Sequence, residues 1–381
     1  MIANVLLAPA TPQQGGVGPL SLGLRLDTGA VCWSDVILPA GPERAAAVLA
    51  IYALRERIAA ALSGQSPDGL GDVAQRVRAA LGDERDEGSA AETLAIAAQQ
   101  AYLAALQTQP DAVERLRREY ALPDGDTILA CYAEISDHAA TAEGIDRLLA
   151  LRPSAVGYRL TAEGELVAEA IGEQAEHLQR FVRELGRRAE MLAPGEGYAP
   201  AVYLGCHGAL GQLAGDPERH IGKVLGYVVG LQGAAGQRQL FLEEPFRLDE
   251  TLAQAANLHR LKDFIRRTPS SLQRAKPTQV VAPWPPAADE AQVYIDIGAV
   301  HGFVASAGGD PHLLLSGLAR ARAAEVDVYW RLPSGATPRQ IAIVVFLAQV
   351  TSSPAILVSG DDGDAGPALV TRLLAEVTVE R

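Results

Sequence analysis

Three runs of strand-forming residues end near side chains that can do chemistry. His207 closes AVYLGCH, Glu243 stands in QLFLEEP, and Arg331 follows VDVYW. An imidazole can act as a general base beside a carboxylate, and a guanidinium can hold a carboxylate or phosphate through two parallel hydrogen bonds. We therefore take His207 and Glu243 as candidate catalytic residues and Arg331 as a candidate anion clamp. The competing interpretations are a histidine hydrogen-bonded under a loop and a salt bridge at the rim.

Further candidates lie near the ends of neighbouring runs. Trp284 ends QVVAPW, Ser306 lies in GFVASA, and Ser359 precedes the polar segment GDDGD. Trp284 is expected to form an apolar wall, and the two serines are expected to bind substrate. Three aspartates in GDDGD oppose an anion, so a solvated capping turn or a weak cation site is expected there. The list is completed by residues in or just after two earlier runs, each of which is singly more often structural than functional: Tyr132, Glu134, Asp137, His138, Tyr158 and Arg159.

The two-residue period of a strand sorts these side chains by face. Tyr329 shares the side of Arg331 and is expected to provide a second apolar wall there. Glu243 and Glu244 are successive residues, so only one of them points inward. Glu244 is expected to form an ion pair with Arg247.

Eight strand-like runs alternate with helical stretches through most of the chain. The runs are Thr127–Ile135, Ala155–Leu160, Ala201–His207, Gln239–Pro245, Gln279–Trp284, Gly302–Ala307, Val326–Leu332 and Ala355–Asp361. This alternation predicts an α/β fold with a closed parallel (β/α)8 barrel, or TIM barrel. The candidate residues would then meet at the C-terminal ends of the strands, which we call the barrel mouth.

The first 122 residues follow a different pattern. Alternating runs at 4–8, 20–27 and 30–37 predict antiparallel strands, with Asp27–Gly29 as a hairpin turn. Apolar spacing then predicts helices over 44–63, 73–81, 89–107 and 110–120. We expect an α+β capping domain at 1–122 and the barrel domain at 123–381, separated by a turn-forming LPDG sequence.

Composition excludes several classes of partner. The chain has 46 acidic and 33 basic residues and a formal net charge of −13, which argues against nucleic acid. It has no apolar run of the roughly 18 residues that a membrane span needs, so no membrane partner is expected. Its three cysteines, Cys32, Cys131 and Cys206, follow no CxxC pattern, which favours a reducing cytoplasm.

The ordered motifs resemble those of the enolase superfamily, and most of all methylaspartate ammonia-lyase. They are DTGAVCWSDV (27–36), VYLGCHGALG (202–211), FLEEP (241–245), VVAPW (280–284), VHGFVAS (300–306), VYWRLPSGATPRQIAIVV (328–345) and ILVSGDDGDAG (356–366). The resemblance implies an N-terminal α+β cap with a (β/α)8 barrel, and a homodimer. It spans nearly the whole chain, with loose individual matches.

The resemblance also implies a metal site that this sequence largely lacks. In the family, carboxylates on the third, fourth and fifth strands hold Mg²⁺, which stabilises an enediolate formed when a base removes the proton α to a carboxylate. The ligand positions fall on Gly205, Glu243 and Ala282–Pro283, so only Glu243 keeps a carboxylate. Because Mg²⁺ prefers near-octahedral oxygen coordination, we expect no cofactor, with weak Mg²⁺ binding as the alternative.

The family's catalytic base is missing as well. Its lysine position on the sixth strand falls on Ser306, and its histidine falls close to Ser154. The lysines of this chain are Lys223 and Lys262, inside predicted helices, and Lys276, in a loop at the opposite end of the fifth strand. Proton abstraction by lysine is therefore not expected.

Two functions remain open from the sequence. The first is a divergent methylaspartate ammonia-lyase-like protein without the Mg²⁺-dependent site, a pseudoenzyme that binds a small anionic ligand or a partner. The second is an active lyase or isomerase on a small carboxylate or phosphorylated substrate, with His207 as acid or base, Glu243 as its partner and Arg331 as the clamp.

Overall fold

The computed structural model describes most of the 381-residue chain. The described residues are 1–9, 20–36, 38, 43–82, 89–124, 130–136, 142–159, 168–195, 197–210, 221–267, 278–285, 287–332, 336–359, 371 and 373. They form two compact units, one of Met1–Asp124, Ala307–Ala319 and Thr337–Thr351, the other of Gly125–Ser306, Arg320–Ala336 and Ser352–Arg381. Within the described ranges, no helix has the length and apolar character needed to cross a membrane.

The first unit contains a three-stranded antiparallel sheet in the order β1-β2-β3. The strands are β1 (Ile2–Pro9), β2 (Leu20–Leu26) and β3 (Val31–Val36). The predicted hairpin turn between β2 and β3 is confirmed. Gly29 has φ 87°, which a glycine adopts without the steric cost of a side chain, and its N–H donates to the carbonyl of Leu26.

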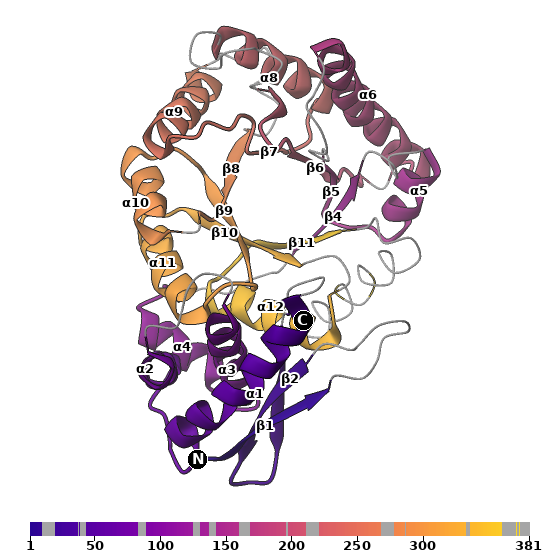
Figure 1. Ribbon diagram of the computed structural model, residues 1–381. Helices are drawn as coiled ribbons and strands as arrows, with labels where there is room; N and C mark the ends of the chain where they lie inside the picture. The colour runs from indigo at the N-terminus through magenta and orange to yellow at the C-terminus, as the bar shows by residue number, and fades with distance from the viewer. Residues whose placement is uncertain are drawn as a thin grey trace. The chain divides into compact units, whose positions relative to one another are not determined.

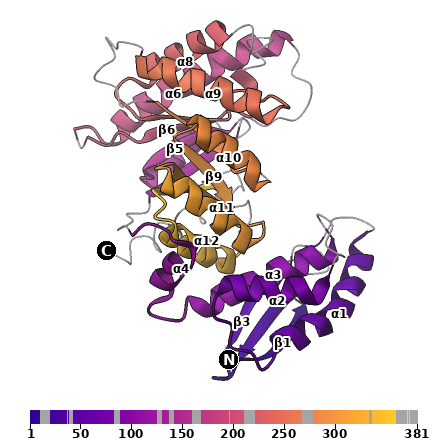
Figure 2. The same cartoon turned by 90° about the vertical axis from the view of Figure 1, so that its left-hand side faces the viewer.

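Four helices follow the sheet in sequence, and the first and third of them pack against its strands (Figure 2). They are α1 (Glu43–Leu62), α2 (Leu70–Leu81), α3 (Ala90–Leu106) and α4 (Ala112–Tyr120). Helix α2 begins three residues earlier than its apolar spacing predicts. The carboxylate of Glu119 on α4 accepts hydrogen bonds from the backbone N–H groups of Leu70 and Gly71, and so satisfies donors of the first turn.

Two helices that follow barrel strands in sequence belong, wholly or in part, to this same unit. Helix α12 (Pro338–Val350) begins with a capping box between Thr337 and Gln340, and Thr337 also donates to Asp35 of β3. The first turns of helix α11 (Pro311–Ala323) also belong to this unit. A hydrogen bond of 2.7 Å joins His312 in these turns to Tyr120 of α4. The unit therefore includes more of the chain than its first 122 residues.

The second unit contains a closed barrel of eight parallel strands, which confirms the predicted fold (Figure 1). The strands are β4 (Ala130–Ser136), β5 (Ala155–Arg159), β6 (Ala201–Gly205), β7 (Leu240–Glu243), β8 (Gln279–Pro283), β9 (Gly302–Ser306), β10 (Asp327–Leu332) and β11 (Ala355–Ser359). Strand β11 pairs with β4 and closes the ring. Helices α5 (Ala142–Ala150), α6 (Ala168–Leu192), α8 (Ile221–Ala235), α9 (Thr251–Arg267) and α10 (Ala288–Ile297) lie outside it.

Strands β6 and β7 are shorter than the sequence predicts. The expected runs continued to His207 and Pro245, whereas the strands end at Gly205 and Glu243. The backbone explains the difference, because His207 and Glu244 both have φ 46°, which is left-handed and incompatible with an extended strand. The two strand ends therefore turn away at corresponding places.

An aromatic layer fills the barrel interior. It consists of the rings of Tyr132, Tyr203, Phe241 and Tyr329, which contribute to a buried cluster together with Val281, Val304 and Leu357. Their centroids lie 5.4–6.2 Å apart, within the range of favourable aromatic contacts. This layer forms an apolar base immediately beneath the mouth.

Candidate functional site

The next inward position along seven of the eight strands gives a mostly polar ring at the mouth, whereas β8 has Pro283 there. In register, Arg159 pairs with Gly205, Gly205 with Glu243, Arg331 with Ser306, and Ser359 with Glu134. Because side chains alternate, each lies two residues beyond an inward position of the layer below. We call Glu134, Arg159, Gly205, Glu243, Ser306, Arg331 and the position of Ser359 the mouth ring.

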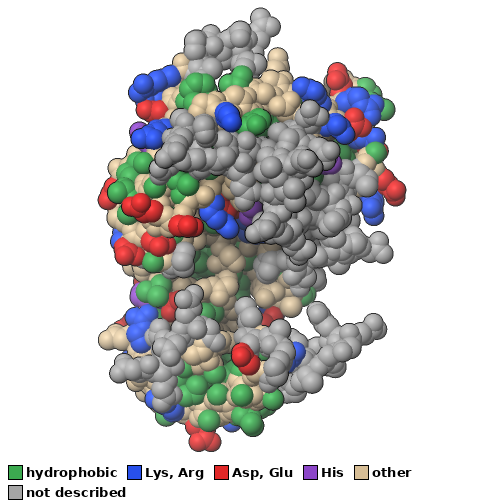
Figure 3. Space-filling view, turned by 45° about the horizontal axis from the view of Figure 1, so that its top comes forward, with side chains coloured by type: hydrophobic (Ala, Val, Ile, Leu, Met, Phe, Trp, Pro, Cys, Tyr) green, Lys and Arg blue, Asp and Glu red, His purple; other side chains and the backbone are tan. Residues whose placement is uncertain are grey.

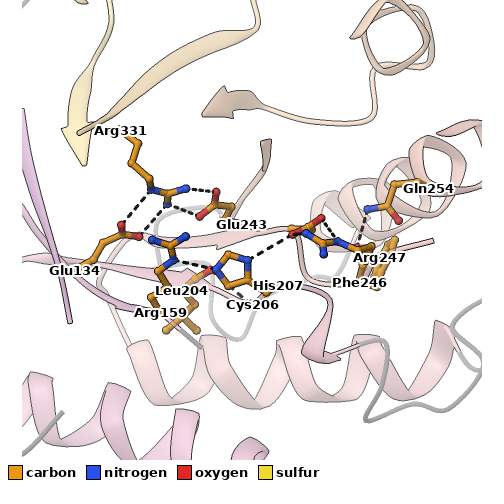
Figure 4. A network of polar contacts seen from close by, with 11 residues as sticks. Glu134, Arg159, Leu204, Cys206, His207, Glu243, Phe246, Arg247, Gln254 and Arg331 are labelled. Carbon is orange, nitrogen blue, oxygen red and sulfur yellow. Dashed lines mark hydrogen bonds and ion pairs between the residues drawn. The ribbon is translucent and has the colours of Figure 1, made fainter. Parts of the chain in front are cut away.

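The centre of the mouth ring is an ion triplet formed by Glu134, Arg331 and Glu243 (Figure 4). Nη1 and Nη2 of Arg331 donate to the two carboxylate oxygens of Glu243 at 2.7 and 2.6 Å. Nη2 and Nε of the same guanidinium donate to Glu134 at 3.0 and 3.3 Å. The side chains of Glu134 and Glu243 are only 3% and 1% exposed, so both carboxylates depend on Arg331 for charge compensation.

The pKa values of the two carboxylates of the triplet are shifted in opposite directions. Burial raises the pKa of Glu134, and the charge of Glu243 adds to this, so the opposing effect of Arg331 does not bring the pKa back to its usual range. Burial also raises the pKa of Glu243, but the charge and hydrogen bonds of Arg331 outweigh it and leave that pKa lowered. Between its two carboxylate partners, the guanidinium keeps its proton, with its pKa well above the ordinary value.

His207 is held at both ring nitrogens. Nε of Arg159 donates to Nε2 of His207 at 3.1 Å, and Nδ1 lies 3.7 Å from Oε2 of Glu244. Because an arginine Nε–H can only donate, Nε2 must accept and the neutral ring carries its proton on Nδ1, toward Glu244. The Nε2 lone pair is therefore engaged and is not available to take a proton from a substrate.

Glu244 continues the contacts of His207 to the rim of the barrel, where it pairs with Arg247. It accepts bonds of 2.7 and 2.9 Å from Arg247, which confirms the predicted ion pair. Burial raises the pKa of Glu244, but the bonds from His207 and Arg247 reverse the shift and leave it lowered. Gly208 is needed here, because a Cβ at that position would lie 2.9 Å from the Cβ of Arg247. Figure 3 shows basic, acidic and histidine side chains together on one face.

The other predicted binding residues are placed differently from one another. Tyr329 faces inward with Arg331, as strand alternation predicts, and belongs to the aromatic layer. Trp284 does not join the inward set, because its ring packs edge-on against Phe303 at 5.1 Å. Ser306 is exposed at the end of β9. Ser359 has its described backbone at the end of β11, while the GDDGD segment at 360–364 and Lys276 lie outside the described residues.

Glu134 and Arg159 prove to be central, although the sequence presented them as isolated residues. Glu134 lies 197 residues from Arg331 along the chain, and β11 separates β10 from β4 in the barrel. The sequence signal that could have found them is strand alternation, because Glu134 and Arg159 are inward positions near the C-terminal ends of β4 and β5. Alternation alone does not indicate which inward neighbours touch.

Comparisons with known proteins agree with this architecture. Residues 158–304 match the family model described as methylaspartate ammonia-lyase C-terminus. A variant methylaspartate ammonia lyase from Clostridium tetanomorphum superposes with a TM-score of 0.76 at 18% identity, covering 99% of this chain and 98% of that one. The enzyme from Citrobacter amalonaticus, solved with 3-methylaspartic acid, gives a TM-score of 0.73 at 18% identity, with 99% of each chain covered.

A more distant structural relative belongs to the wider group. An enolase from Agrobacterium radiobacter gives a TM-score of 0.60 at 16% identity and covers 93% of this chain and 80% of that one. The chain has an enolase-superfamily fold and resembles methylaspartate ammonia-lyase. No curated protein sequence matches it.

The mouth of this methylaspartate ammonia-lyase-like chain does not fit the family's Mg²⁺. Gly205 has no side chain, Ala282 carries only a methyl group, and both oxygens of Glu243 already accept from Arg331. In the described part of the chain, no cluster of three or more His, Cys, Asp or Glu residues is arranged to hold a metal. A divalent ion that prefers six oxygens would have to displace a buried arginine to reach Glu243.

Proposed function

We propose that this methylaspartate ammonia-lyase-like chain is a binding protein whose barrel mouth takes a small anionic ligand without Mg²⁺-dependent proton abstraction. The observation that carries the proposal is the two-bond contact between Arg331 and Glu243, which engages the one carboxylate kept from the family's metal site. A buried guanidinium with two carboxylate partners is not readily exchanged for a weakly held ion, because either partner left alone would be an uncompensated buried charge.

The positions of the lysines support the absence of the family's proton abstraction. Lys262 on α9 donates to the carbonyl of Val300, just before the N-terminal end of β9, and Lys223 lies on α8. The sixth barrel strand ends in Ser306, which is not a base at neutral pH. Neither described lysine is placed at the mouth.

Arg159 replaces Arg331 as the contact that we assign to the anion. Arg331 is neutralised by Glu134 and Glu243, whereas Arg159 donates through Nε to His207 alone among the described residues. Among the described residues its two terminal amino groups make no hydrogen bond, and we assign them to the anion as a fork that suits a carboxylate or phosphate. His207 orients that fork instead of removing a proton.

The test is a thermal-shift screen of small carboxylates and phosphates against the wild type and Arg159→Ala. Losing a charged hydrogen bond costs about 1.5–3 kcal/mol, so the variant should bind a hit roughly tenfold to a hundredfold more weakly. Arg322→Ala is the matched control, because Arg322 pairs with Asp327 at the opposite end of β10. The proposal fails if no anion stabilises the wild type, or if a hit binds Arg159→Ala equally well.

Metal and turnover are tested in the same preparation. Calorimetric titration should detect no tight Mg²⁺ binding to the wild type, and deamination of 3-methylaspartate should be undetectable. Micromolar Mg²⁺ binding that Glu243→Gln abolishes would overturn the proposal.

The second candidate is an active lyase or isomerase with a rebuilt, lysine-free site. The observation that favours it is the pair Glu134 and Glu243, whose pKa values are moved in opposite directions beside one guanidinium, as in many acid–base pairs. The contacts of His207 and Arg331 do not suit the roles of base and clamp. Turnover of an anionic hit that Glu134→Gln abolishes would support this candidate over a binding protein.

The proposed assembly is a homodimer in the cytoplasm. All three cysteines are free and buried, which is compatible with a reducing compartment. A homodimer of 40.1 kDa chains should scatter light with twice that mass. A monomer mass at micromolar concentration would reject the dimer without affecting the proposed site.

A further inference from the structure

The geometry points to Arg331 as a built-in cation: we propose that its guanidinium stands where a divalent ion would bridge Glu134 and Glu243, and that removing it uncovers a divalent-cation site. This deepens the proposed function, because it names the group that makes the mouth independent of metal. It concerns residues from β4, β7 and β10, which are not adjacent strands in the barrel.

The first argument is convergence. Glu134 on β4 and Glu243 on β7 are three strands apart in the ring, yet their carboxylates meet at one centre. There they accept four N–H···O contacts of 2.6–3.3 Å from the single side chain of Arg331. Both carboxylates are almost fully buried. Two such carboxylates without a cation between them would repel each other in a medium of low dielectric, so the position requires positive charge.

The second argument is charge balance. The two carboxylates carry two negative charges, and Arg331 supplies one positive charge. Arg159 supplies another, since its charge also acts on Glu134 and Figure 4 shows its guanidinium beside that carboxylate. Arg331 therefore supplies the positive charge that lies between the two carboxylates. Arg159, which is hydrogen-bonded to His207, acts on Glu134 only through its charge.

The third argument is a further oxygen at the same centre. The hydroxyl of Tyr203 is buried beside the carboxylate of Glu243, and the charges of Arg331 and Glu134 also act on it. Gly205 adds a place for another ligand, because a Cβ there would lie 3.6 Å from Oε2 of Glu243. Oxygen donors of this kind suit Mg²⁺ and Mn²⁺, with water completing the coordination.

The experiment follows Mn²⁺ binding by electron paramagnetic resonance and calorimetry in the wild type, Arg331→Ser and Arg331→Gln. We expect Mn²⁺ to bind one per chain in the two variants, at least about tenfold more tightly than in the wild type. Adding Glu243→Gln to Arg331→Ser should abolish the gain. Adding Gly205→Asp instead should strengthen it, because a third carboxylate joins the site.

The outcomes separate this inference from the proposed function. Tight Mn²⁺ or Mg²⁺ binding by the wild type contradicts both, since Arg331 would then not exclude the ion. No gain of Mn²⁺ binding by either variant overturns the inference alone. If the variants are unfolded without metal, Mn²⁺ should restore their circular dichroism and cooperative melting. Variants that stay unfolded with Mn²⁺ also count against it.

Discussion

The mouth ring and the aromatic layer lie two residues apart on the same strands, yet different forces hold them together. Glu243 lies two residues after Phe241 on β7, and Arg331 lies two residues after Tyr329 on β10. All four side chains point to the barrel interior. The lower layer gains stability from buried apolar area, which is not directional, and from ring contacts, and replacing one of its rings with an aliphatic side chain leaves no uncompensated charge. The upper layer is balanced only while each charge has its partner. One barrel interior thus combines a robust layer with a layer that depends on each residue.

The largest expected effect is the loss of Arg331. Arg331→Ala leaves Glu134 and Glu243 buried without compensation, so the free energy of unfolding should fall toward the upper end of the range of about 3–5 kcal/mol for a broken buried pair. Denaturant unfolding at pH 7 measures it. The triple variant Glu134→Gln/Glu243→Gln/Arg331→Met should recover most of the loss, and a loss below about 1 kcal/mol in the single variant would contradict this account.

A comparable change in the aromatic layer should cost less. Phe241→Leu keeps an apolar side chain and removes ring contacts with Tyr132, Tyr203 and Tyr329, so we expect a loss of about 1–2 kcal/mol in the same unfolding measurement. If Phe241→Leu destabilised the chain more than Arg331→Ala, the contrast between the two layers would be wrong.

The opposite end of the barrel should respond to acid through His301. Burial and the charge of Lys262 lower the pKa of His301 to about 4, and its neutral Nδ1 accepts a hydrogen bond of 3.0 Å from the N–H of Val280. The unfolded chain takes up this proton near pH 6.5, so the contribution is complete above that pH and is lost as the pH falls toward 4. His301→Gln should lose less stability between pH 7 and 5 than the wild type, by chemical denaturation; equal losses would contradict the assignment.

The smallest effect is expected at the rim. The side chain of Arg247 is 60% exposed, so its pair with Glu244 is screened by solvent, and Arg247→Ala should change stability by less than about 1 kcal/mol. Because Glu244 still faces His207, anion binding through Arg159 should be retained. A tenfold loss of anion affinity in Arg247→Ala would instead extend the binding site to the rim.

The sequence by itself determined the barrel, the cap strands and the face on which each strand residue lies. Those properties follow from local periodicity, which each segment carries in its own residues. Alternation alone separates Glu243 from Glu244 and groups Tyr329 with Arg331, and the folded barrel confirms both. The Asp27–Gly29 turn is similarly local.

Only the tertiary structure decided which charges are partners. Glu134 reaches Arg331 because closure of the ring brings β4 and β10 to one mouth, and the missing side chain of Gly205 leaves Arg159 and Glu243 next to each other. The ring of Trp284 does not line the mouth, because it packs against Phe303, whose side chain lies on the outward face of β9. Partnership among inward residues depends on distances across the whole barrel, and no stretch of sequence carries that information by itself.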